Sequence, residues 1–389
     1  MVMLLSLMFK KIFCIVKLNF LILTIRYVYM NIGEKIKQLR QEKSYSLQQL
    51  ADLAGLSKPA IQQYEDNTIN PSNKALQAIA SVLGVGVWSF FSNKKSKLEL
   101  ADFRLGDTLI DAEEEKKTIH KDIVTNSQSY IELEAILNEQ IIFDNPISDL
   151  IINTYDDIEK AVVKLRKKWK LNDNPIDDVT GFLENKGFKI ITVDRPTQSP
   201  GLCGRIKDGD LLIPVIIINI NQEHTREITR KRFTILHELA HLLLIWGTHV
   251  DKQMEEKLCN RFASALLLPD GALKEYIGKD RTTISLEELK TIKHVYGISI
   301  QGIIYRTHNI GLISWEQCEK WLNQYEVWRT SDENFGSYLK SDEMPSRFKR
   351  LLAKALVEKK ISREKAAELL NMKIDEVERQ FINKSFNLN

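Results

Sequence analysis

The stretch Arg230–Trp246, RKRFTILHELAHLLLIW, decides the fold of the C-terminal half of this chain. Its apolar residues lie on every side of a helical turn, so we expect a buried helix. The spacing of His237 and His241 puts both imidazoles on one face of that helix, one turn apart, as a tetrahedral metal requires. Two histidines and Glu238 inside such a helix are costly unless they are ligated or hydrogen-bonded. A metal site is therefore predicted, and hydrogen-bonded core histidines are the alternative.

Two histidines do not complete a catalytic zinc site, which needs a third ligand and keeps a fourth position open to water. The metzincin extension requires Gly at 244 and His at 247, but this chain has Leu244 and Gly247, which excludes that subclass. The downstream candidates for the third ligand are His249, Asp251, Glu255 and Glu256. Glu256 and Asn260 are expected to share one helical face, as a ligand and a residue that supports the ligands.

The combination of TILHELAHLLL (234–244) and EKLCNRFASALLLPD (256–270) resembles the ImmA/IrrE family of metallopeptidases. The resemblance extends upstream through GLCGRIKDGD and the predicted strand PVIIININ (214–221) to about residue 155. It implies a zinc ion held by His237, His241 and Glu256. It also implies that Glu238 is the general base, which takes a proton from a water whose pKa zinc lowers to about 7 and passes it to the leaving amine.

Other features of this half are less decisive. The strand Val215–Ile220 is expected to hold an extended substrate by strand addition, as sheet edges do. Cys259 stands where the family usually has Ala, and we expect a small buried residue, with a redox or metal-competing thiol as the alternative. The residue that stabilises the oxyanion is left open among Tyr296, Tyr305, Arg306, His294 and His308.

The N-terminal part carries a second pattern, a series of short helices with clear boundaries. Ser46 and Gln49 form the S-x-x-Q capping box of one helix, and Gly55 can take the left-handed conformation that ends it. Ser57 can cap the next helix, with Pro59 in its first turn, where a missing N–H costs little. Together with one earlier and two later helical patterns, they predict a bundle of five helices.

The stretch QQLADLAGLSKPAIQQYEDNTINPS (48–72) resembles the lambda-repressor/Cro-like, or XRE, family of DNA-binding domains. The resemblance implies that the third helix enters the major groove of double-stranded operator DNA. It assigns Lys58, Pro59 and Gln63 to base edges, and it assigns Gln48 and Ser57 to phosphates. Pro59 departs from the usual polar residue and cannot hydrogen-bond a base edge. The alternative is a helical bundle that binds protein.

Composition excludes several classes of protein. The 389 residues carry 55 basic and 52 acidic side chains, a net charge of +3, which excludes a protein that coats nucleic acid through bulk charge. The four cysteines lie far apart and form no CxxC pair, which argues for a reducing compartment and against a disulfide scaffold. We therefore expect a cytoplasmic protein without a membrane partner.

Residues 1–29 are apolar but contain four basic and no acidic residues. Their longest charge-free stretch is shorter than the roughly 18–20 residues of a membrane-spanning helix, and they have no signal-peptide core or cleavage site. We expect a non-native leader before a start at Met30, with a membrane-surface segment or a true signal as alternatives. Without this leader the net charge is 3 − 4 = −1.

The whole pattern predicts a mainly α protein with a small β-sheet, an α+β fold. After the leader (1–29) we expect a helix-turn-helix domain (30–95), a helical connector (96–155), a zincin-like metallopeptidase domain (156–310) and a C-terminal helical region (311–389). The connector is expected to consist of solvated helices, and dimerisation along them is left open.

The C-terminal region repeats the helix-turn-helix pattern. Ser362–Met372 parallels Ser46–Leu56 position by position, with Asn371 at the left-handed turn. The face that would read DNA carries Asp375, Glu376 and Glu378, which phosphates would repel. We therefore expect a structural or partner-binding unit.

The leading hypothesis is a DNA-binding regulator whose zinc endopeptidase domain cleaves a repressor or antitoxin-like protein. The alternative is a transcription factor whose zinc domain senses a ligand or partner without cutting it. The complete HExxH motif with Glu238 favours the enzyme, because a purely structural zinc site closes its fourth position and needs no general base.

Overall fold

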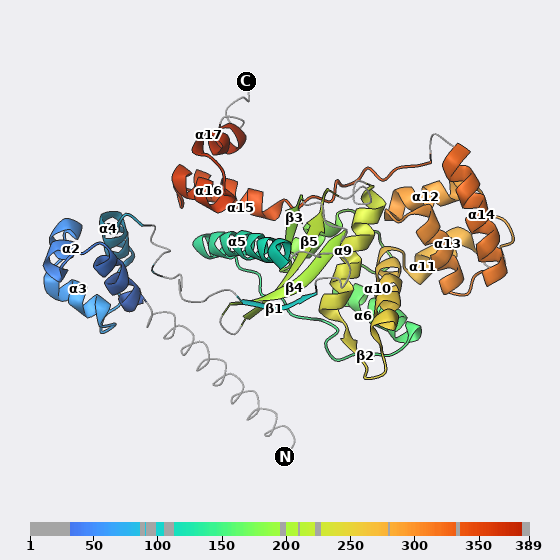
Figure 1. The fold of residues 1–389 in the computed structure, drawn as a ribbon, viewed down its shortest axis with the longest axis horizontal. Coiled ribbons are helices and arrows are strands. Elements are labelled where there is room, and N and C mark those ends of the chain that lie inside the picture. The colour runs from blue at the N-terminus through green and yellow to red at the C-terminus, as the bar shows by residue number, and fades with distance from the viewer. Residues whose placement is uncertain are drawn as a thin grey trace, which may run out of the picture.

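The computed structural model describes residues 32–85, 90, 99–104, 113–194, 200–208, 211–221, 227–278, 281–331 and 335–382. It contains a group of N-terminal helices, a small mixed sheet with helices on both faces, and further helices towards the C-terminus (Figure 1). The predicted α+β class is thus confirmed. The leader and the fifth N-terminal helix, expected around Trp88, lie outside the described residues. No helix in the described part is long and apolar enough to span a bilayer.

The N-terminal helices begin and end where the sequence predicts. Helical residues 32–42 are followed by α2 (Leu47–Ala54), α3 (Lys58–Glu65) and α4 (Asn73–Leu83). The capping box is formed, because the Ser46 hydroxyl accepts from the Gln49 N–H at 3.1 Å and the Gln49 side chain accepts from the Ser46 N–H at 2.8 Å. Gly55 ends α2 at φ 63°, in the left-handed region. Apolar side chains of all four helices share one core.

The central sheet has the strand order β1-β4-β5-β3. Its strands are β1 (Glu99–Arg104), β3 (Lys189–Val193), β4 (Gly201–Asp208) and β5 (Leu211–Asn219). β4 is antiparallel to both of its neighbours, and β3 is parallel to β5. β5 is buried on both faces, which explains its continuous apolar run.

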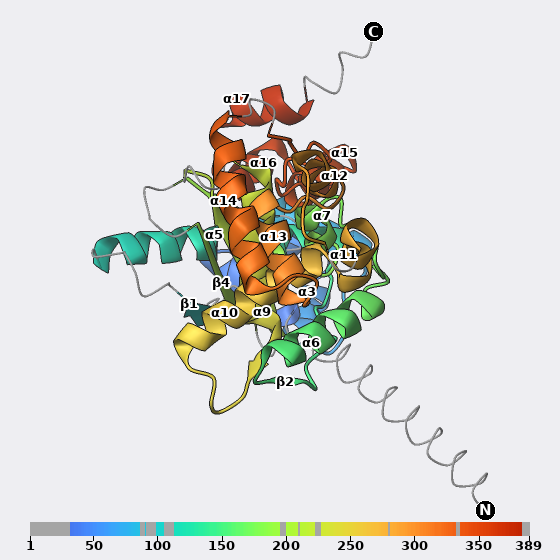
Figure 2. The same cartoon turned by 90° about the vertical axis from the view of Figure 1, so that its right-hand side faces the viewer.

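Helices cover both faces of this sheet. Residues Val215 and Ile217 of β5 pack with Ile123 of α5 (Glu113–Leu137), whereas Ile216 and Ile218 join the main core with α9 (Ile228–Leu243). Figure 2 shows α5 projecting from the sheet, away from α11–α13. The alternation follows from the two-residue period of a strand.

The remaining elements surround α9 or follow it. They are β2 (Ile151–Ile152), α6 (Tyr155–Lys168), α7 (Val179–Glu184), β6 (Ile245–Trp246), α10 (Lys252–Leu267), α11 (Asp270–Ile277), α12 (Leu286–Tyr296), α13 (Ile300–Asn309) and α14 (Trp315–Ser331). β2 and β6 form a separate parallel pair.

The C-terminal helices are α15 (Arg347–Val357), α16 (Arg363–Leu370) and α17 (Ile374–Val377), with a π-helical turn at Glu378–Ile382. Asn371 ends α16 at φ 52°, the left-handed turn that the sequence predicts. Their apolar side chains pack against α5 around Tyr130 and Leu133.

The prediction of a connector made of solvated helices is confirmed for the helix α5 and is wrong in two respects. Residues 99–104 form the strand β1, which pairs with β4. The connector helix α5 is also not solvated all round, because Ile123, Tyr130 and Leu133 are buried. These side chains find their apolar partners in the sheet and in the C-terminal helices, which are far away in sequence. The predicted boundaries of the parts stay predictions.

The prediction of strand addition at Val215–Ile220 is also wrong. β5 lies inside the sheet, where β4 bonds one of its edges and β3 bonds the other. Its backbone groups are therefore already paired and cannot accept a further strand.

Candidate metal centre and DNA-reading helix

α9 is a firmly anchored helix. The Glu227 carboxylate accepts from the Arg230 N–H at 2.8 Å and caps its first turn. Arg232, which is fully buried, pairs with the buried Glu343 and donates from Nε to the Gly297 carbonyl at 3.0 Å. Because a buried charge is tolerated only with such partners, this network holds α9 in one position.

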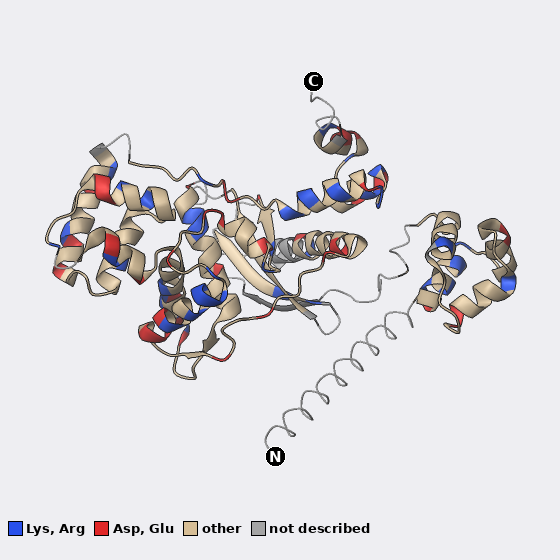
Figure 3. Ribbon diagram, turned by 180° about the vertical axis from the view of Figure 1, so that it is seen from behind, with Lys and Arg blue, Asp and Glu red and all other residues tan. Residues whose placement is uncertain are grey.

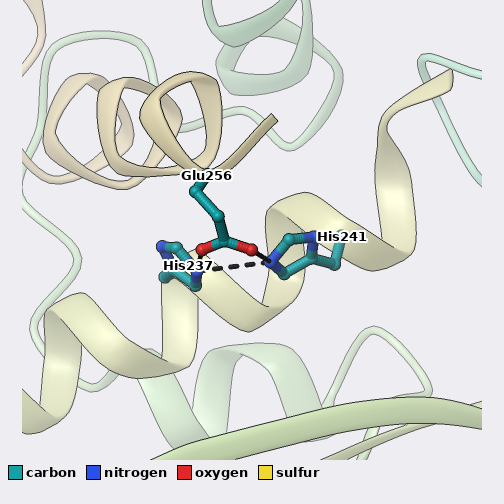
Figure 4. Close-up of side chains that lie close together, drawn as sticks. All are labelled: His237, His241 and Glu256. Carbon is teal, nitrogen blue, oxygen red and sulfur yellow. Dashed lines mark hydrogen bonds and ion pairs between the residues drawn. The ribbon is translucent and has the colours of Figure 1, made fainter. Parts of the chain in front are cut away.

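α10 crosses α9 and brings a carboxylate to its histidines. It begins at Lys252, because Asp251 caps it by accepting from the Met254 N–H at 2.7 Å. Glu256 therefore lies in the second turn of α10. Figure 4 shows its carboxylate facing His237 and His241 from the opposite helix.

The three side chains converge on one point. The Nε2 atoms of His237 and His241 lie 3.2 Å apart, and the Glu256 oxygens lie 3.1 Å from Nε2 of His237 and 3.4 Å from Nε2 of His241. A tetrahedral zinc ion with ligand bonds of about 2.0–2.1 Å needs ligand atoms about 3.3 Å apart. The three donor atoms fit this spacing.

The far side of each imidazole is held by another residue of α10. Nδ1 of His237 lies 3.0 Å from Oδ1 of Asn260, and Nδ1 of His241 lies 3.0 Å from Oε1 of Glu255. Both oxygens accept hydrogen bonds, so each Nδ1 carries the proton and donates it. Each Nε2 atom then faces the point of convergence, where it binds either a proton shared with Glu256 or, as in ligating histidines, a metal ion.

Electrostatics also favour a cation between these groups. Hydrogen bonds from His237 and His241 hold the pKa of Glu256 well below its usual range, so this carboxylate is ionised. Burial disfavours the charged form of His237, but the hydrogen bond to Glu256 and the nearby Glu238 charge outweigh burial and raise its pKa. A positive charge at this point, whether a proton or a metal ion, is therefore stabilised.

Glu238 lies between α9 and the sheet. Burial raises its pKa, although the positive potential of His237 and His241 and a hydrogen bond with Cys203 act in the opposite direction. A Cβ atom added to Gly201 would lie 3.1 Å from Oε1 of Glu238, so the backbone of β4 passes directly over this carboxylate. A carboxylate with a raised pKa beside a metal site is suited to proton transfer near neutral pH.

The residues assigned to DNA contacts lie on the exposed surface of α2 and α3. Lys58, Pro59 and Gln63 are exposed on α3, and Gln48 is exposed at the start of α2. Ser57 is exposed as well, but its hydroxyl accepts from the Ala60 N–H at 3.3 Å and caps α3. Figure 3 shows both acidic and basic residues on the N-terminal group of helices.

Comparison with known proteins finds a family for the N-terminal helices and for the part that contains α9. Residues 36–87 match the family model described as helix-turn-helix, and residues 194–308 match the model described as the IrrE N-terminal-like domain. An XRE-type helix-turn-helix and an IrrE-like domain share this chain. Both resemblances seen in the sequence are thereby confirmed.

Two curated relatives match short stretches of this chain. The transcriptional regulator SinR of Bacillus licheniformis is 42% identical over 64 residues, which cover 16% of this chain and 58% of that protein. The immunity repressor of Bacillus phage phi105 is 38% identical over 58 residues, 15% of this chain and 40% of that protein. The chain thus spans little more than half the length of these relatives, or less.

A solved structure, that of Bacillus thuringiensis PlcR with a peptide and DNA, aligns over 91% of this chain and 99% of that chain at 13% identity. Its TM-score is 0.18, which carries no argument about the fold.

Within the IrrE-like domain, the other candidate ligands have different places. His249 is exposed, Asp251 caps α10, and Glu255 faces Nδ1 of His241. The carboxyl and imidazole groups that converge in the described residues are those of His237, His241 and Glu256.

Several candidates for the oxyanion role are engaged elsewhere. Arg306 is buried and bonds Glu159 and Asp270, and the Tyr296 hydroxyl donates to the Asp173 carbonyl at 3.1 Å. His308 contacts the Ile313 carbonyl through Nδ1 at 3.2 Å, whereas Tyr305 and His294 are exposed. Cys259 is fully buried, as predicted, with Sγ 3.5 Å from Nδ1 of His241.

Sequence reasoning misses the roles of two residues. It suggests Glu255 as a metal ligand, whereas Glu255 contacts Nδ1 of the ligand His241. Only the crossing of α9 and α10 decides which carboxylate reaches Nδ1 of His241 and which reaches its Nε2. Cys203 comes from β4, about 35 residues before Glu238, and no motif links them.

Proposed function

We propose that this protein is a DNA-binding regulator whose IrrE-like domain hydrolyses a peptide bond in a repressor or antitoxin-like protein with the help of zinc. The observation that carries the peptidase part is the convergence of His237, His241 and Glu256, with their ligand atoms within 4.8 Å of one another, beside Glu238. A cytoplasmic location follows from DNA binding.

The zinc ion would be held by Nε2 of both histidines and by the Glu256 carboxylate. When bound, it supplies Lewis acidity, which lowers the pKa of a water to about 7. Asn260 and Glu255 orient the two imidazoles and fix the tautomer that leaves each Nε2 unprotonated.

Glu238 would receive the proton of the attacking water on its carboxylate and return it to the leaving nitrogen. Its partly buried position between α9 and β4 keeps bulk water from competing for that proton. The hydrogen bond with Cys203 and the contact with Gly201 hold the carboxylate in place.

Glu238→Gln, compared with wild type, tests the peptidase. We expect zinc content to be retained, because Glu238 is not among the converging ligands, and we expect turnover of a co-expressed candidate repressor to be lost. The zinc content is measured by mass spectrometry and the repressor by immunoblot. Repressor loss that continues in a zinc-loaded Glu238→Gln variant would exclude proteolysis by this site, and a domain that senses without cutting would then be the better account.

The DNA-binding part rests on α3 and its match to the helix-turn-helix model. Lys58, Pro59 and Gln63 would face base edges in the major groove, with Gln48 and Ser57 beside phosphates. A homodimer would let two copies of α3 reach two half-sites of an operator.

The double variant Lys58→Ala with Gln63→Ala tests this part in an operator-binding assay. We expect weaker binding, by about 1–3 kcal/mol for each side chain that no longer reaches a base edge. Lys121→Ala with Gln128→Ala is the matched control, since it removes the same residue types from exposed positions of α5. Equal affinity of the α3 variant and this control would refute the assignment of α3.

A further inference from the structure

β4 is the strand of the sheet that lies against the candidate catalytic glutamate. Gly201 and Cys203, two residues apart, point to the same face of β4 and both contact Glu238. A Cβ on Gly201 would also come within 2.6 Å of the Thr234 side chain, so only a bare backbone fits between β4 and α9 here. A polypeptide lying alongside this end of β4 would therefore be led to Glu238.

β4 has two edges, and they are bonded differently. Along one edge, β5 pairs from Asp208 opposite Leu211 to Gly201 opposite Ile218. These two strands are joined by a short connection, as in a hairpin. Along the other edge, β1 pairs antiparallel, from Glu99 opposite Lys207 to Arg104 opposite Cys203. β1 thus runs towards Gly201 and the glutamate.

We propose that this second edge of β4 is a binding surface for an extended polypeptide, and that β1 is its internal occupant. The inference rests on the proposed peptidase function in one respect, since it takes the substrate to be an extended chain that must reach Glu238. A substrate strand would pair with the same backbone groups of β4 that β1 uses, so the two exclude each other.

Three observations indicate that β1 can leave this edge. Among the described strands β1 has one neighbour, so β4 supplies the ladder hydrogen bonds that hold it. An irregularity in the register between Leu100 and Asp102 interrupts even this ladder. β1 also comes from a segment about 100 residues before β4, whereas the pairing of β4 and β5 is local. Exchanging an edge strand costs less than opening a hairpin.

Because of its position in the chain, β1 connects the DNA-binding helices to the rest of the protein, so its replacement by a substrate strand would also affect this connection. β1 follows the helix-turn-helix residues 36–87 and precedes α5, which packs on the sheet and on the C-terminal helices. The segment that tethers the DNA-reading helices is therefore the segment that fills the polypeptide-binding edge.

Two variants of the full-length protein test the inference in opposite directions. Asp102→Pro with Phe103→Pro frees the edge: the N–H groups of successive strand residues point to opposite sides, so one proline removes a donor that faces β4. Glu99→Cys with Lys207→Cys locks it, because these residues are directly opposed and lie at separations that a disulfide can bridge. The lock lies six residues along β4 from Gly201, about 20 Å away, so it does not touch the glutamate.

The probe is a fluorescent peptide with the sequence of residues 97–106, KLELADFRLG, and its binding is followed by fluorescence polarisation. We expect the proline variant to bind it about tenfold more tightly than wild type. The oxidised lock should bind it more weakly than wild type, and reduction should restore binding. Lys207→Cys alone is the control and should respond to neither oxidation nor reduction. Equal binding by the oxidised and reduced lock would overturn the inference even if the proline variant failed to fold.

Hydrolysis of labelled unfolded casein, measured on the zinc-loaded variants, separates the two proposals. If peptide binding falls when the disulfide of the double-cysteine variant forms, and no variant hydrolyses casein, the result supports β1 as the occupant of the β4 edge and counts against the peptidase. Hydrolysis that is the same in the oxidised and reduced lock supports the peptidase and refutes β1 as the occupant.

Discussion

At the scale of single residues, each histidine of the metal centre uses its two nitrogens for different tasks. The Nε2 atoms face each other and Glu256, while the Nδ1 atoms face Asn260 and Glu255. The partners of Nδ1 come from the same helix as Glu256. A change at one of these partners should therefore disturb metal binding without removing a ligand.

We expect Asn260→Ala to weaken zinc binding by about 10–100-fold, because His237 loses the acceptor that orients its ring. Zinc affinity measured by competition with a chelator checks this. Asn323→Ala, at an exposed position of α14, is the matched control, and His241→Ala, which removes a ligand, sets the limit of full loss. If Asn260→Ala bound zinc as tightly as Asn323→Ala, the orienting role of Asn260 would be wrong.

At the scale of elements, capping residues set where the N-terminal helices begin, and an ion pair fixes how these helices are arranged. Ser46, Ser57 and Ser72 each cap a helix of the N-terminal group through a backbone N–H three residues ahead. The arrangement of these helices depends on a further contact. Arg40 forms a two-pronged pair with Glu65 at the end of α3, at 2.6 Å from Nε and 2.8 Å from Nη2, with both side chains largely buried.

We expect Glu65→Gln to lower the unfolding free energy of the N-terminal group by about 3 kcal/mol, because Arg40 is left as a largely buried charge without its partner. Hydrogen exchange of the amides in residues 32–42 measures that free energy locally. Glu34→Gln, at an exposed position of the same helix, serves as control. Replacing both partners together, as Arg40→Leu with Glu65→Leu, should recover much of the loss, and a double variant as unstable as the single one would argue against this cause.

At the scale of the whole molecule, polar clusters tie distant parts of the chain together. Glu159 of α6 bonds Arg306 of α13 and Arg261 of α10, and Arg306 also bonds Asp270. Lys189 of β3 pairs with Glu134 of α5, which also pairs with Arg347 of α15. Such clusters fix the relative position of helices that do not share a local motif.

We expect the stabilisation from Glu159 to depend on pH. Burial raises its pKa, but Arg306 and Arg261 outweigh burial and hold the pKa below the ordinary glutamate value of 4.5. Because the folded pKa is below the unfolded one, the stabilisation is full above about pH 4.5 and is lost as pH falls through the folded pKa.

Melting temperatures of wild type and Glu159→Gln across this range check the expectation. The difference between the two proteins should be largest near neutral pH and should shrink in acid. Glu319→Gln, exposed on α14, is the control. A difference that stayed constant down to about pH 3 would show that Glu159 acts through packing and not through its charge.

The sequence by itself determined the parts whose signals are local. Helix boundaries follow from capping serines and left-handed residues such as Gly55 and Asn371, and the pairing of His237 with His241 follows from the helical period. Both family resemblances rest on such short stretches, and both are confirmed.

Only the tertiary structure decided which residues from different elements meet. The crossing of α9 and α10 places Glu255 and Asn260 beside the Nδ1 atoms and Glu256 beside the Nε2 atoms. The packing of α9 against β4 brings Gly201 and Cys203 over Glu238. The order of the strands puts β5 inside the sheet and β1 at its edge, against the expectation from the sequence. The physical reason is that hydrogen-bonded pairing of strands, and burial between elements, join residues about 100 positions apart, for which a local pattern holds no information.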